Sequence, residues 1–324
     1  MTHAELHERQ GWTLQQKIDH SLEVIEAFVS RMGGLDKVYC SFSGGKDSTV
    51  LLDLCRIVYP DIKAVFFNTG NEYPDIVHFV KKLIGKGYNI DIVRPKYTPR
   101  QVWEQYGFPL ISKEQSLVLR QIKTTQSDKL RNYRLYGSED GKRRAGTLSK
   151  KWRPLIEASF MISEQCCQKL KKAPAHKYTK TTGRHPIIGT MASESKLRET
   201  AYIQAGGCNV FDSSKGAESK PLSIWNEEDI WAYIKLRNLE IAEIYHKGAT
   251  RTGCVGCGFG IQYADDSRFD LLYSLHPKYY NMVMDYTNNG VTYREAVRKV
   301  LQICGKHLPD EQPKNLFSEI DYKL

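Results

Sequence analysis

Apolar residues recur at steps of three and four along residues 14–32, which predicts an amphipathic helix that ends at the Gly33-Gly34 pair. Short apolar runs with the length of buried strands follow this helix. They cover residues 38–42, 64–67, 90–93 and 186–189. Helical periodicity fills residues 49–57, 75–84 and 193–204. Strands that alternate with helices predict an α/β fold, with a parallel twisted sheet wound with helices.

The same pattern predicts three consecutive parts of the chain. Residues 1–36 form an N-terminal helical segment, residues 37–235 form the α/β domain, and residues 236–324 form a mainly helical region that carries a cysteine loop. In a parallel sheet, ligands bind at the carboxyl ends of the strands, near the point where the strand order reverses. The loops that follow the predicted strands are therefore the first place to look for a site.

Composition excludes two classes of protein. Of the 324 residues, 41% are hydrophobic and 26% are charged, which is typical of globular domains and excludes wholesale disorder. No apolar run approaches the 18 residues of a membrane span, and the first thirteen residues are too polar for a secretory signal. We therefore expect a soluble, cytoplasmic protein without membrane contact. Its eight cysteines are then better interpreted as thiols or metal ligands than as disulfides.

Positive charge is concentrated in one segment. The chain has a formal net charge of +10, and residues 120–153 contain eleven Lys and Arg against three Asp and Glu. Three glycines and little periodicity predict that residues 120–153 form a polar, basic insertion in the α/β domain. This insertion is either a solvated or mobile face or a surface that follows the phosphates of a nucleic acid.

The loop after the first predicted strand has the composition of an anion site. Its sequence is Ser43-Gly44-Gly45-Lys46-Asp47-Ser48. The glycines permit close backbone approach, and the following helix adds the partial positive charge of its N-terminus. Lys46 adds a full charge, the two serines can donate hydrogen bonds to phosphate oxygens, and Asp47 can cap the helix or hold Mg²⁺. The spacing differs from a Walker A loop, and the structural alternative is a glycine-rich turn without a ligand.

This loop resembles the Ser-Gly-Gly-x-Asp-Ser signature of the PP-loop ATP pyrophosphatases and their relatives, the phosphoadenylyl-sulfate (PAPS) and adenylyl-sulfate (APS) reductases. Three later stretches resemble the reductase branch in the expected order, over about residues 37–260. They are Asn68-Thr69-Gly70 within residues 68–74, the block 189–198 that retains Gly189, Glu194, Ser195 and Arg198, and residues 220–231.

Two positions depart from the reductase pattern: Asn68 replaces an Asp, and Met191 stands where an arginine is expected to contact sulfate or phosphate. The resemblance implies an adenine-nucleotide hydrolase-like fold. It also implies a nucleotide site formed by residues 43–48, Asn68, Thr69, Gly70, Gly189 and Arg198.

Four cysteines form a candidate metal site. Cys166-Cys167 is followed by Cys254-Val255-Gly256-Cys257, and four soft thiolates suit an iron–sulfur cluster or zinc. The arrangement resembles the Cys-Cys…Cys-x-x-Cys ligand set of [4Fe–4S] APS reductases and of cluster-bearing DNA phosphorothioation pyrophosphatases. It therefore implies a [4Fe–4S] cluster, with zinc or unliganded buried thiols as the alternatives.

A further cysteine is a candidate nucleophile. Cys304-Gly305-Lys306-His307 resembles the C-terminal Glu-Cys-Gly-x-His motif that carries the nucleophilic cysteine of the reductases, although Ile303 replaces the glutamate. The resemblance implies that the Cys304 thiolate, stabilised by its basic neighbours, attacks a sulfur atom. The other interpretation is a buried cysteine at the end of a helix over residues 293–303.

Three functions follow from this resemblance. In the preferred one, Lys46, Asp47 and Mg²⁺ hold ATP, pyrophosphate leaves, and a sulfur donor protein displaces AMP from the adenylated acceptor, as in nucleic-acid thiolation or phosphorothioation. In the second, APS or PAPS binds, Cys304 attacks its sulfur and thioredoxin releases sulfite. In the third, an inactive relative senses the nucleotide. The complete Gly-Gly-Lys-Asp-Ser loop and Met191 favour the first.

Overall fold

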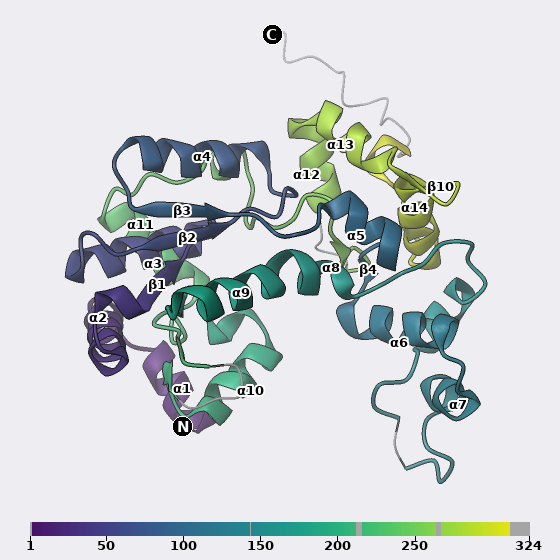
Figure 1. Ribbon diagram of the computed structural model, residues 1–324, viewed down its shortest axis with the longest axis horizontal. Coiled ribbons are helices and arrows are strands. Elements are labelled where there is room, and N and C mark those ends of the chain that lie inside the picture. Colours follow the sequence, from purple (N-terminus) through teal and green to yellow (C-terminus); the bar gives the residue numbers. More distant parts are fainter. Residues whose placement is uncertain (1, 143, 212–215, 264–266, 312–324) are drawn as a thin grey trace, which may run out of the picture. The chain divides into compact units, whose positions relative to one another are not determined.

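A six-stranded sheet forms the core of one of two structural units (Figure 1). The computed structural model describes residues 2–142, 144–211, 216–263 and 267–311. Residues 1–96 and 171–253 group around this sheet and are called the sheet unit below. Residues 97–170 and 254–324 form the second group, called the cysteine unit. Within the described residues, no helix combines the length and the apolar character needed to cross a membrane.

The sheet unit alternates strands and helices as the sequence predicts. Its strands are β1 (Val38–Ser41), β2 (Ala64–Phe67), β3 (Ile90–Val93), β5 (His185–Ile188), β6 (Asn209–Val210) and β7 (Glu218–Ser219). Its helices are α1 (His3–Gln10), α2 (Leu14–Met32), α3 (Lys46–Val58), α4 (Pro74–Gly85), α9 (Ala173–Thr182), α10 (Lys196–Ala205) and α11 (Glu227–Leu236). The strand order is β3-β2-β1-β5-β7-β6, parallel except for the β6–β7 pair. The predicted α/β fold with a mostly parallel sheet is confirmed.

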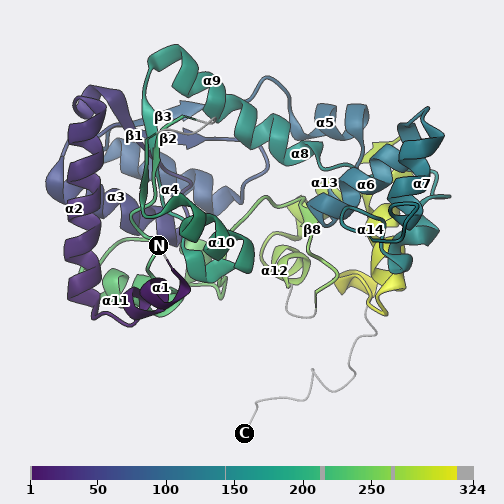
Figure 2. The ribbon, with the colours of Figure 1, turned by 90° about the horizontal axis from the view of Figure 1, so that it is seen from below.

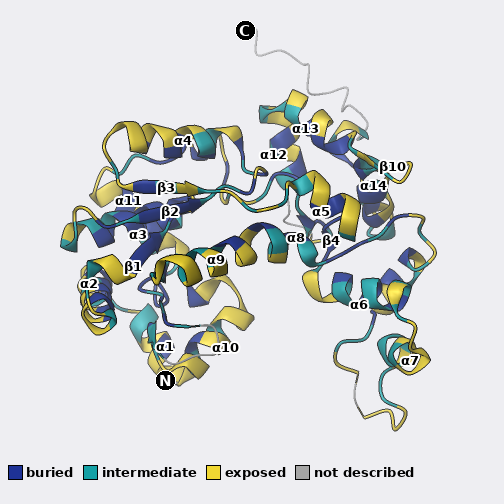
Figure 3. Ribbon diagram, viewed as in Figure 1, coloured by how far each residue is buried: buried dark blue, intermediate teal, exposed yellow. Residues whose placement is uncertain are grey.

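Helices cover both faces of this sheet, because the side chains of β1 alternate between the faces and are apolar on both. Tyr39 points to the face on which the Tyr178 ring of α9 packs, with the ring centroids 5.0 Å apart. Cys40 and Phe42 point to the opposite face, where they meet Cys55 of α3 and Phe79 of α4. Figure 3 shows β1 and β2 as a continuous buried centre.

The strand order fixes where a ligand can bind. The chain runs outward from β1 through β2 to β3, and it later returns to β5 on the other side of β1. Parallel neighbours that diverge in this way create a crevice at their carboxyl ends. The loops after β1 and β5 lie side by side at this end of the sheet, since Gly189 lies next to Asp47.

The predicted boundaries between parts differ from the observed ones. The N-terminal helices belong to the sheet unit, where α2 packs against α3 and α11 (Figure 2). Residues 97–170, which include the whole basic segment 120–153, belong to the cysteine unit instead of the α/β domain. Hydrophobic periodicity identifies a helix and its apolar face, but it does not say which core that face joins.

The cysteine unit consists of helices around short strands. Its helices are α5 (Pro99–Tyr106), α6 (Lys113–Thr124), α7 (Asp128–Tyr136), α8 (Gln165–Cys167), α12 (Arg268–Leu275), α13 (Pro277–Met284) and α14 (Tyr293–Ile303). Its strands are β4 (Leu110–Ile111), β8 (Gly258–Phe259), β9 (Thr287–Asn288) and β10 (Val291–Thr292). The rings of Trp103, Phe108 and Tyr293 meet in its core, with the Trp103 and Tyr293 centroids 4.7 Å apart.

A buried ion pair ties α2 to α11. Lys17 Nζ lies 2.6 Å from Asp229 Oδ2, and the lysine is 1% exposed. Next to it, Ser21 donates a hydrogen bond to the Pro221 carbonyl and accepts one from the Trp225 indole. The residue block 220–231 therefore anchors α2.

Replacement of this lysine should destabilise the protein. Lys17→Met leaves the Asp229 carboxylate, which is only 14% exposed, without its cation, and we expect this to cost about 3 kcal/mol of unfolding free energy in urea denaturation. Lys63→Met is the matched control, because the Lys63–Asp91 pair is partly exposed and should contribute about 1 kcal/mol or less. Equal urea midpoints for the two variants would contradict this role of Lys17.

Candidate functional site

The predicted anion loop lies at the reversal point of the sheet. Gly45 has an extended backbone and serves as the N-cap of α3, so the helix begins at Lys46, three residues earlier than the sequence predicts. Gly44 has φ +75°, and a Cβ there would lie 2.8 Å from Ile76 Cγ2. A Cβ on Gly189, after β5, would lie 3.2 Å from the Asp47 carbonyl oxygen. The predicted glycines thus allow two close backbone approaches beside the loop.

Two backbone amides of the loop donate hydrogen bonds to hydroxyl oxygens of the protein. The Ser43 amide donates to Ser48 Oγ over 3.1 Å, and the Lys46 amide donates to the Tyr245 hydroxyl over 2.9 Å. Tyr245 Oη lies 3.0 Å from Thr252 Oγ1, and both oxygens lie over the open side of Gly45. A phosphate oxygen can accept from the same amides at this helix N-terminus.

Lys46 is a buried cation at this site. It is 5% exposed, and its Nζ lies 3.1 Å from Asp47 Oδ1 and 3.4 Å from Glu227 Oε1. Burial alone lowers the pKa of Lys46, but the Asp47 and Glu227 carboxylates raise it above its ordinary value. The Trp231 ring also lies 5.9 Å from Nζ. Lys46 is therefore charged and held in place near the helix N-terminus.

Two arginines add positive charge next to the loop. Burial lowers the pKa of Arg198, the charge of Arg251 lowers it further, and Asp47 acts in the opposite direction. Arg198 also forms an ion pair with Glu194. Since the guanidinium groups repel each other, an anion that binds both would relieve this repulsion.

Met191 adds no positive charge next to the loop. The residue is 4% exposed, so the position at which the reductases have an arginine faces the interior here. Sequence reasoning missed Arg251, Tyr245 and Thr252, because all three lie outside the recognised blocks. It also gave no role to Glu227 and Trp231, although both lie in the block 220–231.

The polar side chains of the turn after β2 form hydrogen bonds within the turn. Asn68 Oδ1 accepts a hydrogen bond from the Gly70 amide over 2.9 Å, and Gly70 has φ +77°. Thr69 is buried and donates to Glu72 over 2.6 Å. These contacts shape the turn, and nucleotide contact by Asn68, Thr69 and Gly70 stays a prediction.

The four predicted metal ligands lie together in the cysteine unit. Burial raises the pKa of the Cys166 thiol, and the nearby thiols of Cys254, Cys257 and Cys167 raise it further. The other three cysteines are half-buried. Since like charges oppose one another here, a bound cationic centre would be needed to hold all four as thiolates.

The Cys-x-x-Cys loop is held by the aromatic core. Tyr293 donates a hydrogen bond to the Gly256 carbonyl over 3.0 Å, and Arg268 donates to the Cys257 carbonyl over 2.7 Å. A Cβ on Gly256 would lie 2.7 Å from the Trp103 ring, so the loop needs glycine there. The buried Trp103 Nε1 is directed at no oxygen or nitrogen acceptor among the described residues; it lies close enough to the Cys166 thiol to lower its pKa. An indole donor next to thiolates fits a sulfur-rich centre.

Cys304 is half-buried at the end of α14. Lys306, which the sequence suggested as a partner of its thiolate, instead donates hydrogen bonds to the carbonyls of Ile261 and Tyr263. His307 is exposed. The nucleophilic role of Cys304 stays a prediction.

Part of the basic segment serves the fold. Arg120 forms two hydrogen bonds with Glu164, and three other basic side chains donate to backbone carbonyls, namely Lys123, Arg134 and Arg153. The hydrogen bonds of Arg120 and Lys123 connect the segment, which includes α7, to other parts of the cysteine unit, and those of Arg134 and Arg153 lie within the segment. Its remaining described basic residues are exposed: Lys129, Arg131, Lys142, Arg144, Lys150 and Lys151. Arg143 lies outside the described residues, and nucleic-acid binding stays a prediction.

Comparison with known proteins gives one family match. The model of the phosphoadenosine phosphosulfate reductase domain matches residues 37–258. The uncharacterized protein MJ0973 of Methanocaldococcus jannaschii is 26% identical over 76% of this chain, which spans only 46% of that protein. An adenosine 5'-phosphosulfate reductase of Halalkalibacterium halodurans is 23% identical, covering 76% of this chain and 84% of that protein. The crystal structure of PAPS reductase from Candida auris, in a phosphate complex, has a TM-score of 0.42 at 15% identity and covers 76% of this chain and 93% of that one.

Proposed function

The chain belongs to the phosphoadenosine phosphosulfate reductase family, and on that premise we propose that it is a sulfonucleotide reductase that binds adenylyl sulfate at residues 43–48. Several curated relatives are named adenosine 5'-phosphosulfate reductases. They support the reductase alternative more than the ATP-dependent function that the sequence alone favoured.

The observation that carries this proposal is the positive charge around the loop. The N-terminus of α3, the buried Lys46 ammonium and the adjacent Arg198 and Arg251 all favour an anion at the carboxyl end of β1. A phosphosulfate group is such an anion, with negative charge on both its phosphate and its sulfate. Arg251 supplies a cation that Met191 cannot. Binding of the phosphate displaces the Tyr245 hydroxyl from the Lys46 amide.

The reaction transfers the sulfonate group and then reduces it. A thiolate, for which Cys304 is the candidate, attacks the sulfur; an S–S bond forms, the bond from sulfur to the bridging oxygen breaks, and AMP leaves with the electron pair. A dithiol reductant such as thioredoxin then attacks the cysteine sulfur, sulfite leaves, and the reductant becomes a disulfide. Lys46 and the arginines hold the phosphate and stabilise the charge that develops on AMP.

The residues of the cysteine site suit a [4Fe–4S] cluster, with zinc as the alternative. Cys166, Cys167, Cys254 and Cys257 would hold it, and the buried Trp103 N–H would donate to a sulfur of the centre. A bound cluster would supply an iron–thiolate centre whose charge offsets the repulsion among these thiolates. The residues of this chain keep that centre partly shielded, since Cys166 is 7% exposed.

ATP is the second candidate substrate, and the Lys46 ion pairs favour it. A buried lysine held between Asp47 and Glu227 is suited to a pyrophosphate leaving group, which Mg²⁺ at Asp47 would also bind. The products would be pyrophosphate and an adenylated acceptor, from which a sulfur donor protein displaces AMP. A nucleic-acid acceptor would use the exposed lysines and arginines between residues 129 and 151.

An anaerobic assay with adenylyl sulfate, PAPS and ATP decides between these substrates. We expect sulfite and AMP in equal amounts from adenylyl sulfate with a dithiol reductant, and loss of sulfite in Cys304→Ser with nucleotide binding unchanged. Cys208→Ser is the matched control, because Cys208 is a buried thiol outside both candidate sites. Pyrophosphate from ATP without sulfite from either sulfonucleotide would reject the reductase and support the second candidate.

A further inference from the structure

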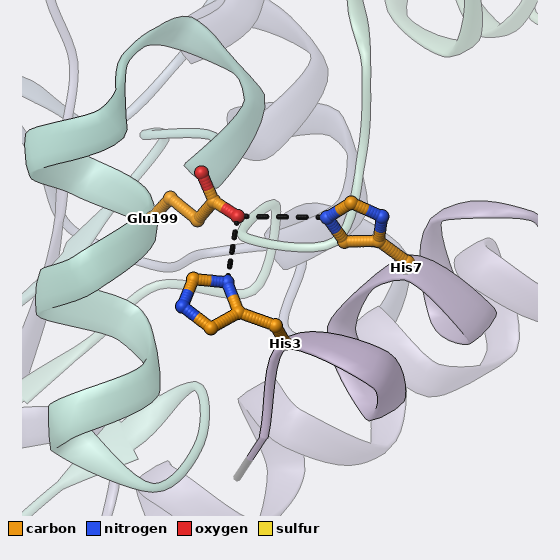
Figure 4. Close-up of side chains that lie close together, drawn as sticks. All are labelled: His3, His7 and Glu199. Atoms are coloured by element: carbon orange, nitrogen blue, oxygen red, sulfur yellow. Dashed lines mark hydrogen bonds and ion pairs between the residues drawn. The ribbon is translucent and has the colours of Figure 1, made fainter.

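A second cluster of metal-ligating side chains lies on the surface of the sheet unit, and none of the motifs above includes it. It consists of His3, His7 and Glu199 (Figure 4). Glu199 Oε1 lies 3.0 Å from His3 Nδ1 and 3.5 Å from His7 Nε2. The three ligand atoms all lie within 4.8 Å of one another.

Two helices place these groups together. His3 and His7 are four residues apart on α1 and therefore share one face of that helix. Glu199 comes from the first turn of α10, and its side chain points to both imidazoles (Figure 4). Leu6 is 0% exposed, so α1 is packed onto the unit independently of the cluster. The ligand atoms are thus held close together by the fold itself.

We propose that His3, His7 and Glu199 bind a divalent transition-metal ion of the zinc type. Two imidazole nitrogens and one carboxylate oxygen are a common three-ligand set for zinc. Zinc bonds of about 2.0–2.1 Å in a tetrahedron require ligand atoms about 3.3 Å apart. The two separations that involve Glu199, 3.0 and 3.5 Å, lie on either side of that value, and the two imidazole nitrogens lie within 4.8 Å of each other. Rotation of the exposed histidine side chains would complete the geometry that the ion requires.

The site would fasten helices together instead of performing catalysis. The sequence His3-Ala4-Glu5-Leu6-His7 lacks the glutamate that follows the first histidine in H-E-x-x-H metalloproteases. Glu5 caps α1 through the Thr2 backbone amide. The histidine side chains are 69% exposed, so water completes the coordination from the open side. The bound ion links α1 to α10, the helix that also carries Arg198.

Zinc titration of the full-length protein, with any affinity tag removed, tests this proposal. Equilibrium dialysis should show one zinc per chain fewer in the His3→Ala/His7→Ala variant than in the unmodified protein. Saturating zinc should raise the thermal midpoint of the unmodified protein by about 5 °C more than that of the variant, because the ion binds the folded state. Glu199→Gln, which removes the charge and keeps the volume, should also lose this ion.

Controls separate this site from the cysteines. Zinc held by the four cysteines contributes equally to both proteins, so only the difference of one ion reports on His3 and His7. His176→Ala removes an exposed histidine elsewhere in the sheet unit and should keep the full zinc content. Mg²⁺, which prefers oxygen ligands, should leave the midpoint unchanged. Equal zinc content and equal midpoint shifts for the double variant and the unmodified protein would overturn the proposal, whatever the outcome of the nucleotide assays.

Discussion

Lys46→Met should weaken binding of adenylyl sulfate or ATP by about 100-fold. Lys46 is buried, its pKa is raised by Asp47 and Glu227, and it lies in the first turn of α3 where the anion is proposed to bind. Methionine keeps most of the side-chain volume but removes the cation. It also leaves two carboxylates unneutralised near the phosphate, so the repulsion adds to the lost attraction. Isothermal titration with each nucleotide measures the effect.

Lys17→Met is the matched control for this measurement. It removes another buried lysine of the sheet unit, so it reports the loss of stability that a buried charge replacement causes. At a temperature at which both variants are folded, the Lys17 variant should keep the nucleotide affinity of the unmodified protein. Equal affinity of the Lys46 variant and the unmodified protein would reject the anion site at residues 43–48.

The same variant identifies which phosphate Lys46 contacts. If the lysine holds a β,γ-pyrophosphate, Lys46→Met reduces ATP affinity far more than adenylyl sulfate affinity. If it holds the phosphosulfate, the loss is largest for adenylyl sulfate. The comparison thus separates the two candidate functions by binding alone, before any acceptor is known.

The sheet could be predicted because its strands carry local signals. The apolar runs at 38–42, 64–67, 90–93 and 186–189 correspond to β1, β2, β3 and β5, each within one residue of the observed bounds. Strands β6 and β7 have two residues each, which is too short for a recognisable apolar run. The sequence pattern predicts that this helix, α3, starts at residue 49 instead of at Lys46, because Gly44-Gly45 indicates a turn and does not show that Gly45 itself caps the helix.

The site could be predicted only where the ligand groups are local in sequence. The loop 43–48 and the cysteine pairs are short motifs, and each chemical group in them is visible in the sequence. Arg251 and Tyr245 come to the loop by tertiary folding from about 200 residues away. His3 and Glu199 are likewise 196 residues apart and meet only through the packing of α1 and α10. The hydrophobic periodicity of the sequence does not indicate contacts between residues so far apart in the chain.

Cys166→Ser should abolish iron binding and the broad absorbance near about 400 nm that a [4Fe–4S] protein shows when purified anaerobically. Cys166 is the most buried of the four thiols, and a serine hydroxyl is a poor ligand for this soft centre. Because cluster binding stabilises the fold that holds it, the variant should also unfold at lower temperature. Metal analysis and thermal unfolding measure both effects. Cys208→Ser, the same change at a buried thiol of the sheet unit, should keep the iron.

Trp103→Phe tests whether the cluster is held as the cysteine unit suggests. Phenylalanine keeps an aromatic ring next to Gly256 but removes the buried N–H that acts on Cys166. Loss of one such donor around a metal centre weakens metal retention about 10- to 100-fold, so iron should leave faster to a chelator while the freshly reconstituted protein still binds it. A colourless unmodified protein with stoichiometric zinc at these cysteines would contradict the cluster. If iron leaves Trp103→Phe no faster than it leaves the unmodified protein, the cluster proposal stands, but the Trp103 indole does not stabilise the cluster.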